Sequence, residues 1–180
     1  MEEVLHEEPE PEQTGPVFPE ITRADLPAML QQAVARAGWT TLSPVQAKVI
    51  PYLRAGRDVM AQAQTGSGKT GAFILPILER IRPERNTCQA LVLVPTRELA
   101  QQVSADATLL AGDTGIRVTA VYGGTSYRPQ VDAFKQGAHL VVGTPGRILD
   151  HLIHRNLTLD HLETLIFDEA DRLMSMGFFP

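Results

Sequence analysis

The sequence predicts an α/β fold in which a parallel sheet is flanked by helices. After residue 71, four apolar runs rich in β-branched side chains alternate with segments of helical periodicity. The runs are continuously apolar, which indicates strands buried on both faces, and the strand–helix repetition is typical of a parallel sheet. A glycine-rich loop at residues 63–70, directly before a helical segment, favours the same class. The length of 180 residues suits one such domain with a sizeable core.

Two helices are expected before the glycine-rich loop. Residues 25–37 place apolar side chains at helical spacing before Gly38, and a second helix starts with Ser43 as N-cap and Pro44 at the first helical position. The second helix should end near Gly56. A short apolar run at 59–61 is interpreted as a strand that leads into the loop, with a helix over 71–81 after it. Later strands are expected at 90–94, 118–122, 139–143 and 164–167, and later helices at 97–110, 129–136, 147–154 and 170–176.

Residues 63–70 read Ala-Gln-Thr-Gly-Ser-Gly-Lys-Thr and are typical of a loop that binds phosphates. Gly66 and Gly68 allow backbone N–H groups to turn toward a polyphosphate, and the N-terminus of the following helix adds partial positive charge. Lys69 can reach the β- and γ-phosphates, and the Thr70 hydroxyl can bind Mg²⁺. The usual pattern begins with Gly, where this chain has Ala63, and an ordinary glycine turn before a helix is the structural alternative. The loop predicts binding of a nucleoside triphosphate.

An acidic pair follows the last predicted strand. Asp168 and Glu169 come directly after residues 164–167, at the strand end where open α/β sheets bind ligands. Beside a triphosphate, Asp168 can hold Mg²⁺ through its water shell, and Glu169 can act as general base toward the attacking water. The alternative is an acidic first turn that stabilises the following helix through its dipole. The pairing with the phosphate loop favours the metal site.

At these residues the chain resembles a DEAD-box ATP-dependent RNA helicase, since residues 168–171 spell Asp-Glu-Ala-Asp, and the likeness extends over about residues 39–178. The resemblance implies a RecA-like P-loop NTPase domain that uses ATP and Mg²⁺. It implies adenine recognition by Gln46, although a capping box with Ser43 is the structural alternative. Trp39 would stack on the adenine or pack beneath the loop. The implied nucleotide-binding residues are Trp39, Gln46, Gln64, Thr65, Gly66, Ser67, Gly68, Lys69 and Thr70.

Three further motifs resemble the segments that line the RNA path in this family. They offer hydroxyls, glycines that let phosphates approach the backbone, and arginine charge. Such contacts would read the RNA backbone and not the bases, so sequence-independent RNA binding is implied. Ordinary loop chemistry is the alternative for each turn, and the two arginines could also form internal salt bridges. The residues are Pro95, Thr96, Arg97, Gly123, Gly124, Thr144, Pro145, Gly146 and Arg147.

Composition divides the chain into three parts. Residues 1–17 combine glutamates and prolines, so we expect a disordered acidic tail. Residues 18–57 form the helical segment with Gln46, and residues 58–180 form a partial RecA-like ATP-binding domain. Seven of the 21 acidic side chains lie within residues 1–21, which hold no Lys or Arg, so residues 22–180 carry 16 basic against 14 acidic side chains. This balance permits nucleic-acid binding without requiring it.

Several other functional classes are not supported by the sequence. The single cysteine, Cys88, excludes an internal disulfide, which fits a reducing cytoplasm, and it is interpreted as a small residue at the edge of the core. The five histidines do not cluster with ligand spacing, so no zinc site is expected. No apolar run approaches the roughly 18–20 residues that cross a bilayer, and no signal segment is present.

The resembled helicases continue beyond the point that corresponds to Pro180. They carry a Ser-Ala-Thr motif, whose strand lies between the phosphate-loop strand and the strand ending at Asp168, and a second RecA-like domain with arginine fingers. Without that strand, two neighbours should expose unpaired backbone groups. We therefore expect weak nucleotide binding and little helicase activity from residues 1–180 alone. A non-hydrolysing RNA- or partner-binding module is the alternative function, and a DNA helicase is a weaker one.

Overall fold

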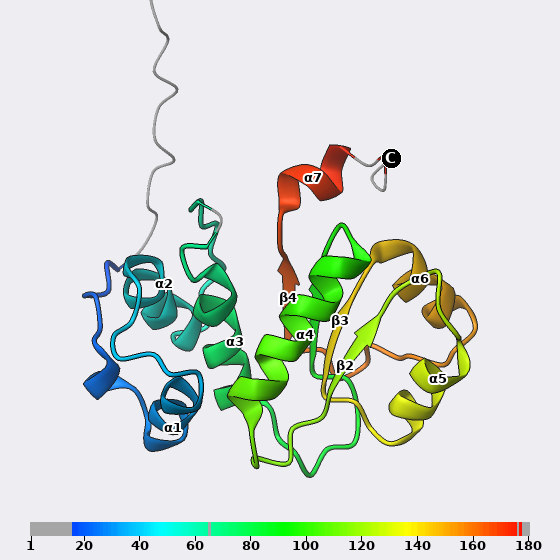
Figure 1. Cartoon of the computed structure of the whole chain (residues 1–180), viewed down its shortest axis with the longest axis horizontal. Coiled ribbons are helices and arrows are strands. Elements are labelled where there is room, and N and C mark those ends of the chain that lie inside the picture. Colours follow the sequence, from blue (N-terminus) through cyan, green and yellow to red (C-terminus); the bar gives the residue numbers. More distant parts are fainter. Residues whose placement is uncertain (1–15, 65, 176, 178–180) are drawn as a thin grey trace, which may run out of the picture.

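The computed structural model describes residues 16–64, 66–175 and 177, so most of the expected acidic tail lies outside the described residues. Figure 1 shows the arrangement of the elements along the chain. The elements are η1 (Arg23–Asp25), α1 (Ala28–Arg36), α2 (Pro44–Arg54), α3 (Lys69–Arg80), β1 (Ala90–Leu93), α4 (Arg97–Ala111), β2 (Val118–Val121), α5 (Arg128–Lys135), β3 (Leu140–Gly143), α6 (Pro145–Ile153), β4 (Thr164–Phe167) and α7 (Ala170–Ser175).

The four strands form one parallel sheet in the order β2-β3-β1-β4. All four lie where the sequence predicts them, and the alternation with helices is confirmed. The register is level at the carboxyl end of the sheet: Leu93 pairs with Gly143 and with Phe167, and Val121 pairs with Gly143. The chain therefore leaves all four strands along one row.

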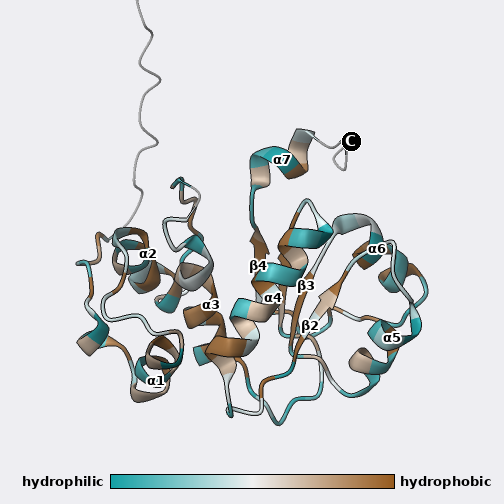
Figure 2. Cartoon of the chain, viewed as in Figure 1, coloured by the Kyte–Doolittle hydropathy of each residue, from teal (hydrophilic) through white to brown (hydrophobic). Residues whose placement is uncertain are grey.

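Alternate residues of the central strands build a core on each face of the sheet. Ala90 and Val92 of β1 join a cluster with α1, α3 and α4, whereas Leu91 joins Val121, Val141 and Ile148 beneath α5 and α6. In Figure 2, brown (hydrophobic) residues gather along α3 and the central strands, and teal (hydrophilic) residues recur on α4, α5 and α6. Among the described residues, none of the helices combines the length and apolarity that crossing a membrane demands.

Helix α1 begins three residues later than the expected start at Asp25. Asp25 belongs instead to the 3₁₀ turn η1, where its carboxylate accepts hydrogen bonds from the backbone N–H and hydroxyl of Thr22. Leu26 precedes Pro27 and is extended, at φ −76° and ψ 146°. The proline ring disfavours a helical conformation in the residue before it, so Leu26 stays outside the helix, which starts at Ala28 with Pro27 as its N-cap.

The strand expected at residues 59–61 is absent, so this expectation was wrong. Residues 57–64 form neither helix nor strand, and the side chain of Met60 is 98% exposed. Strand β4 is the last strand of the described sheet on this side, and an open pocket lined by Val59, Ala61 and Ile166 separates the two segments. A lone extended segment has no ladder partner for its backbone, which explains why the apolar run does not become a strand.

A substitution at Gly143 tests the packing of β2, β3 and α6 against one another. A Cβ added there would lie 2.5 Å from the Val121 carbonyl oxygen and 2.7 Å from Ile148 Cδ1, where neither backbone nor core can yield easily. We expect Gly143→Ala to lower the free energy of unfolding by about 1–3 kcal/mol in a urea titration. Gly123→Ala is the matched control, since a Cβ there meets nothing within 4 Å. Equal stability of the two variants would contradict the described packing of β2, β3 and α6.

Candidate functional site

The predicted site residues come together at the carboxyl edge of the sheet. Pro95 and Thr96 follow β1, Gly123 follows β2, Thr144 follows β3, and Asp168 follows β4. The Thr144 N–H donates to Val121 at 3.0 Å and the Asp168 N–H donates to Leu93 at 3.0 Å, so the ladder extends to the first residue beyond β3 and β4. This edge is where open parallel sheets bind their ligands.

The glycine-rich loop turns sharply into α3. Gly66 and Gly68 have φ values of +79° and +94°, which glycine adopts without strain. The Ser67 N–H donates to the Gln64 carbonyl at 3.2 Å, and Gly68 is the N-cap of α3, with Lys69 and Thr70 in its first turn. Thr65 lies outside the described residues. In this arrangement the Lys69 ammonium donates to the Ala63 carbonyl, so the loop closes on itself through its own lysine.

Two features of the loop fit a phosphate group. The Ser67 hydroxyl oxygen is shielded from solvent and has no hydrogen-bond partner within the described part of the chain. Such an unpaired buried group is costly and is relieved when a ligand supplies the partner. The first turn of α3 also presents its N-terminal backbone N–H groups at this point. The residues present therefore match the chemistry of a bound polyphosphate.

Gln46 connects α2 to the loop. Its side-chain oxygen accepts from the Ser43 N–H at 2.9 Å while the Ser43 hydroxyl accepts from the Gln46 N–H at 3.5 Å, so the capping-box alternative is confirmed. Its Nε2 donates to the Gly68 carbonyl at 3.1 Å, and only 3% of the residue is exposed. One amide thus caps α2 and holds the backbone of the phosphate loop.

Trp39 packs against the first turns of α3. A Cβ added to Gly71 would lie 2.5 Å from the Trp39 ring and 2.6 Å from Gln46 Nε2, so only glycine allows the ring this close to the helix. Trp39 is half-buried and joins the core cluster on this face. The packing alternative for Trp39 therefore describes the structure, and stacking on an adenine stays a prediction.

The pKa of Asp168 is shifted by its burial and by its charged neighbours. Burial raises the pKa of its carboxyl above the usual value, and the adjacent Glu169 carboxylate raises it further. The Glu169 N–H, which donates to Asp168 Oδ1 at 3.0 Å, and the Lys69 ammonium lower this pKa. Asp168 and Lys69 line the same open pocket. The two halves of the predicted nucleotide site, Lys69 of α3 and Asp168 after β4, thus line one pocket. The Lys69 ammonium and the Glu169 N–H compensate the charge of the Asp168 carboxylate only in part.

Glu169 adopts a strained backbone. Its φ is +51°, in the left-handed region that non-glycine residues rarely occupy, and such strain gathers at functional sites. Its carboxylate accepts a hydrogen bond of 2.6 Å from Arg172 one turn later in α7. The glutamate predicted as general base is therefore paired with Arg172 through one of its two carboxylate oxygens.

The motifs after β1 and β2 lie side by side. Thr96 caps α4 and accepts from the Leu99 N–H at 3.2 Å, and Pro95 is buried beneath it. The Arg97 side chain is 61% exposed and pairs with Glu98 at 2.6 Å. A Cβ added to Gly124 would lie 3.7 Å from the Arg97 guanidinium, so that charge sits beside the exposed glycine turn. The Arg97 guanidinium is therefore accessible to a ligand from solution.

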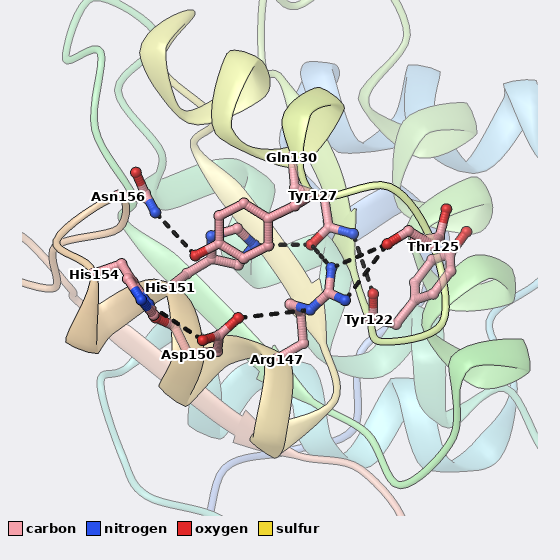
Figure 3. Close-up of polar contacts among 9 residues, drawn as sticks. All are labelled: Tyr122, Thr125, Tyr127, Gln130, Arg147, Asp150, His151, His154 and Asn156. Carbon is pink, nitrogen blue, oxygen red and sulfur yellow. Dashed lines mark hydrogen bonds and ion pairs between the residues drawn. The ribbon is translucent and has the colours of Figure 1, made fainter.

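Arg147 behaves differently, although the sequence does not separate the two arginines. Pro145 and Gly146 start α6 at the edge, but the Arg147 side chain is only 16% exposed. Its guanidinium donates to the Thr125 carbonyl and to Gln130 Oε1, as Figure 3 shows. Gln130 and the buried His151 beside it are residues of this site that no sequence motif indicates. Nothing in a single sequence marks one polar residue of an amphipathic helix as buried.

Within the part of the chain that the structure describes, the cysteine is a packing residue and the acidic and histidine side chains form no metal cluster. Cys88 is 4% exposed, and burial raises the pKa of its thiol to about 12, which confirms its interpretation as a packing residue. Across residues 16–64, 66–175 and 177, no group of three or more His, Cys, Asp or Glu side chains is arranged to hold a metal ion. Asp168 would need phosphate oxygens and water as fellow ligands of Mg²⁺.

Comparisons with known proteins all identify DEAD-box proteins or helicases as relatives of this chain. Residues 43–180 match the model of the family described as DEAD/DEAH box helicase. The DEAD-box ATP-dependent RNA helicase CshA of Streptococcus pneumoniae serotype 4 is 50% identical over 154 residues, or 86% of this chain and 29% of that protein. The ATP-dependent RNA helicase DeaD of Klebsiella pneumoniae is 50% identical over 162 residues, or 88% of this chain and 25% of that protein.

A solved structure of a DEAD box protein from the hyperthermophile Methanococcus jannaschii aligns with a TM-score of 0.82 and 38% identity. The alignment covers 89% of this chain and 45% of that one. Together with the parallel four-stranded sheet, this likeness confirms the predicted RecA-like α/β fold. The chain spans less than a third of the length of the two curated relatives named above.

Proposed function

The chain belongs to the DEAD/DEAH box helicase family, and we propose that it is the N-terminal ATP- and RNA-binding part of an RNA helicase. In this proposal, ATP hydrolysis is coupled to local unwinding of an RNA duplex. The observation that supports it is the level register of the four strands, from which the acidic pair and the three loop motifs leave along one edge, while Lys69 of the phosphate loop lines the same pocket as Asp168. The CshA and DeaD relatives are named as ATP-dependent RNA helicases.

The ATP phosphates would bind to the loop at residues 64–70. The backbone N–H groups of Gly66 and Gly68 would donate to phosphate oxygens, and the Ser67 hydroxyl would gain its missing partner. Lys69 would exchange the Ala63 carbonyl for the β- and γ-phosphates, which offer a charged acceptor in its place. The adenine would lie near Gln46 and Trp39, whose remaining hydrogen-bonding capacity and ring face suit a purine.

Thr70 and Asp168 would hold Mg²⁺. When bound, the ion supplies positive charge that offsets the negative charge of the phosphates during transfer. The uncompensated carboxylate of Asp168 favours a cation in this position. Glu169, which is paired with Arg172 through one carboxylate oxygen, would accept the proton of the attacking water.

RNA would lie along the same edge and be read through its backbone. The exposed turns at Gly123, Gly124 and Gly146 let phosphates approach the chain, and Arg97 supplies charge beside them. Thr144 is the N-cap of α6 but its side chain makes no cap hydrogen bond, so its hydroxyl can donate to a phosphate. The glycines and the Thr144 hydroxyl offer no donor and acceptor pattern specific to one base, which supports sequence-independent binding.

The first test removes the phosphate-binding lysine. Lys69→Ala should weaken binding of a fluorescent ATP analogue with Mg²⁺ by about 10–100-fold, the loss expected for a hydrogen bond to a charged group. Lys135→Ala, an exposed lysine at the end of α5, is the matched control and should leave the affinity unchanged. Unaltered affinity in the Lys69→Ala chain would exclude the proposed phosphate site.

A second test separates the two roles of Gln46. Gln46→Glu keeps an acceptor for the Ser43 N–H, as in an ordinary capping box, but removes the Nε2 donor to Gly68. We expect about tenfold weaker binding of the ATP analogue, together with lower thermal stability, because a buried carboxylate oxygen would face the Gly68 carbonyl oxygen. Ser43→Ala should lose about 1 kcal/mol of stability with a smaller change in affinity. Equal effects of both variants on affinity would show that the link to Gly68 has no special role.

The third test concerns the chain by itself. Arginine fingers contribute about 10³–10⁵ in rate in related NTPases, and the resembled helicases carry theirs in a second domain. We therefore expect residues 1–180 to bind the ATP analogue weakly and to release phosphate at a negligible rate, with or without single-stranded RNA. Phosphate release would be compared with that of the intact Streptococcus pneumoniae CshA under the same conditions. Matching RNA-stimulated rates would refute this expectation.

A further inference from the structure

We propose that Gln130 is a positioning residue that, together with Arg147 and His151, holds the Gly123–Gly124 turn in the shape that meets an RNA backbone. This inference rests on the proposed function. Figure 3 shows the network, in which α5 supplies Gln130, α6 supplies Arg147 and His151, and the segment after β2 supplies Tyr122 and Thr125. The glycine turn itself is exposed, and a Cβ added to Gly123 would touch nothing.

The network holds the turn from both sides. Gln130 Nε2 donates to the carbonyl of Tyr122, the residue before Gly123, at 3.1 Å. Arg147 donates through both terminal nitrogens to the carbonyl of Thr125, the residue after Gly124, at 3.5 Å. Gln130 Oε1 accepts from Arg147 at 3.3 Å and so joins the two anchors. The two glycines, which have no side chains to fix them, are thus bracketed by hydrogen-bonded carbonyls.

The partners fix the orientation of the Gln130 amide. The Tyr122 carbonyl can only accept and the Arg147 guanidinium can only donate, so Nε2 must face Tyr122 and Oε1 must face Arg147. His151 Nε2 lies 2.9 Å from the same Oε1 and must therefore carry a proton and donate. Gln130 is 5% exposed, so no water replaces these bonds easily when they are lost.

The buried surroundings of His151 favour its neutral form. His151 is fully buried, stacks on Tyr127 at a centroid distance of 4.2 Å and meets Phe134 edge-on at 5.0 Å. Burial lowers the pKa of His151, and the Arg147 charge lowers it further. Its Nδ1 has no partner among the described residues, which a lone pair tolerates better than an N–H. A phenylalanine would supply the same ring contacts but not the donor to Gln130.

Arg147 is immobilised by more than this amide. Its guanidinium carbon lies 5.3 Å from the centre of the Tyr127 ring, and Asp150 lies 4.0 Å from its Nε. The Arg147 guanidinium is therefore held within the protein, whereas Arg97, which pairs with Glu98, has a side chain that is 61% exposed beside Gly124. Arg147 thus acts on RNA through the turn that it holds, and Arg97 is the arginine that would touch the ligand.

The test replaces Gln130 with a side chain of similar size that cannot form these bonds. Gln130→Met should raise the Kd for a labelled single-stranded RNA about tenfold, the loss expected when bonds to buried and charged groups are broken. The Kd for the fluorescent ATP analogue should stay within about twofold, because the phosphate loop lies on α3, outside this network. His151→Phe should act in the same direction with a smaller effect. Gln136→Met, exposed at the end of α5, is the matched control and should change neither affinity.

A second measurement reports on the turn without RNA. Backbone ¹⁵N relaxation of Gly123 and Gly124 should give lower order parameters in Gln130→Met than in the parent chain. Unchanged order parameters would overturn the positioning role, as would a parallel loss of ATP-analogue affinity and thermal stability, which would show general destabilisation. If the parent chain bound no RNA while the turn loosened as expected, the proposed RNA function would fail and the positioning role would be kept.

Discussion

Parallel pairing on both sides of β1 is the constraint on which the rest of the site depends. Leu93, Gly143, Phe167 and Val121 end their strands in one row, so each following loop starts at the same height. A slip of one residue would turn every side chain of the slipped strand to the opposite face and move the next loop along the strand axis. The row is kept in place by the two cores, since alternate residues of β1 and β3 are buried on opposite faces. The geometry of the site and the packing of the two cores therefore depend on the same strand register.

Two loops at this edge are held in the same way, each by a buried glutamine side chain. Gln46 and Gln130 are both buried, and each uses its amide oxygen and nitrogen together. Each donates to a backbone carbonyl at or next to a glycine, namely Gly68 and the Tyr122 that precedes Gly123. A glycine gives the backbone access to a ligand but no side chain that packs, so its conformation must be set from outside. A buried amide can do this because it satisfies a carbonyl and a donor simultaneously.

The sequence was most informative where a local pattern decides the outcome. The positions of the four strands and of the helix after the phosphate loop followed from apolar runs, capping residues and glycine spacing. The expected burial on both faces holds for β1 and β3 but was wrong for β2 and β4, which lie on the two sides of the sheet. The late start of α1 was also predictable, because Pro27 excludes a helical Leu26. The segment at 59–61 was not, since a strand needs a neighbour and its own residues do not supply one. The separate roles of Arg97 and Arg147 depend on Gln130, whose burial arises only from how α5 meets α6.

The outer edge of β4 affects how this chain behaves in bulk solution. Its residues, Thr-Leu-Ile-Phe, carry no charge, and Leu165 and Phe167 are 44% and 45% exposed. Natural sheets blunt such edges with lysine, proline or a covering element, and the strand itself contains neither residue. The backbone groups along this edge can therefore form hydrogen bonds with the same strand of another molecule. The exposed Leu165 and Phe167 side chains would stabilise the resulting pair. Solubility of the purified chain would then be limited by concentration well before the fold itself fails.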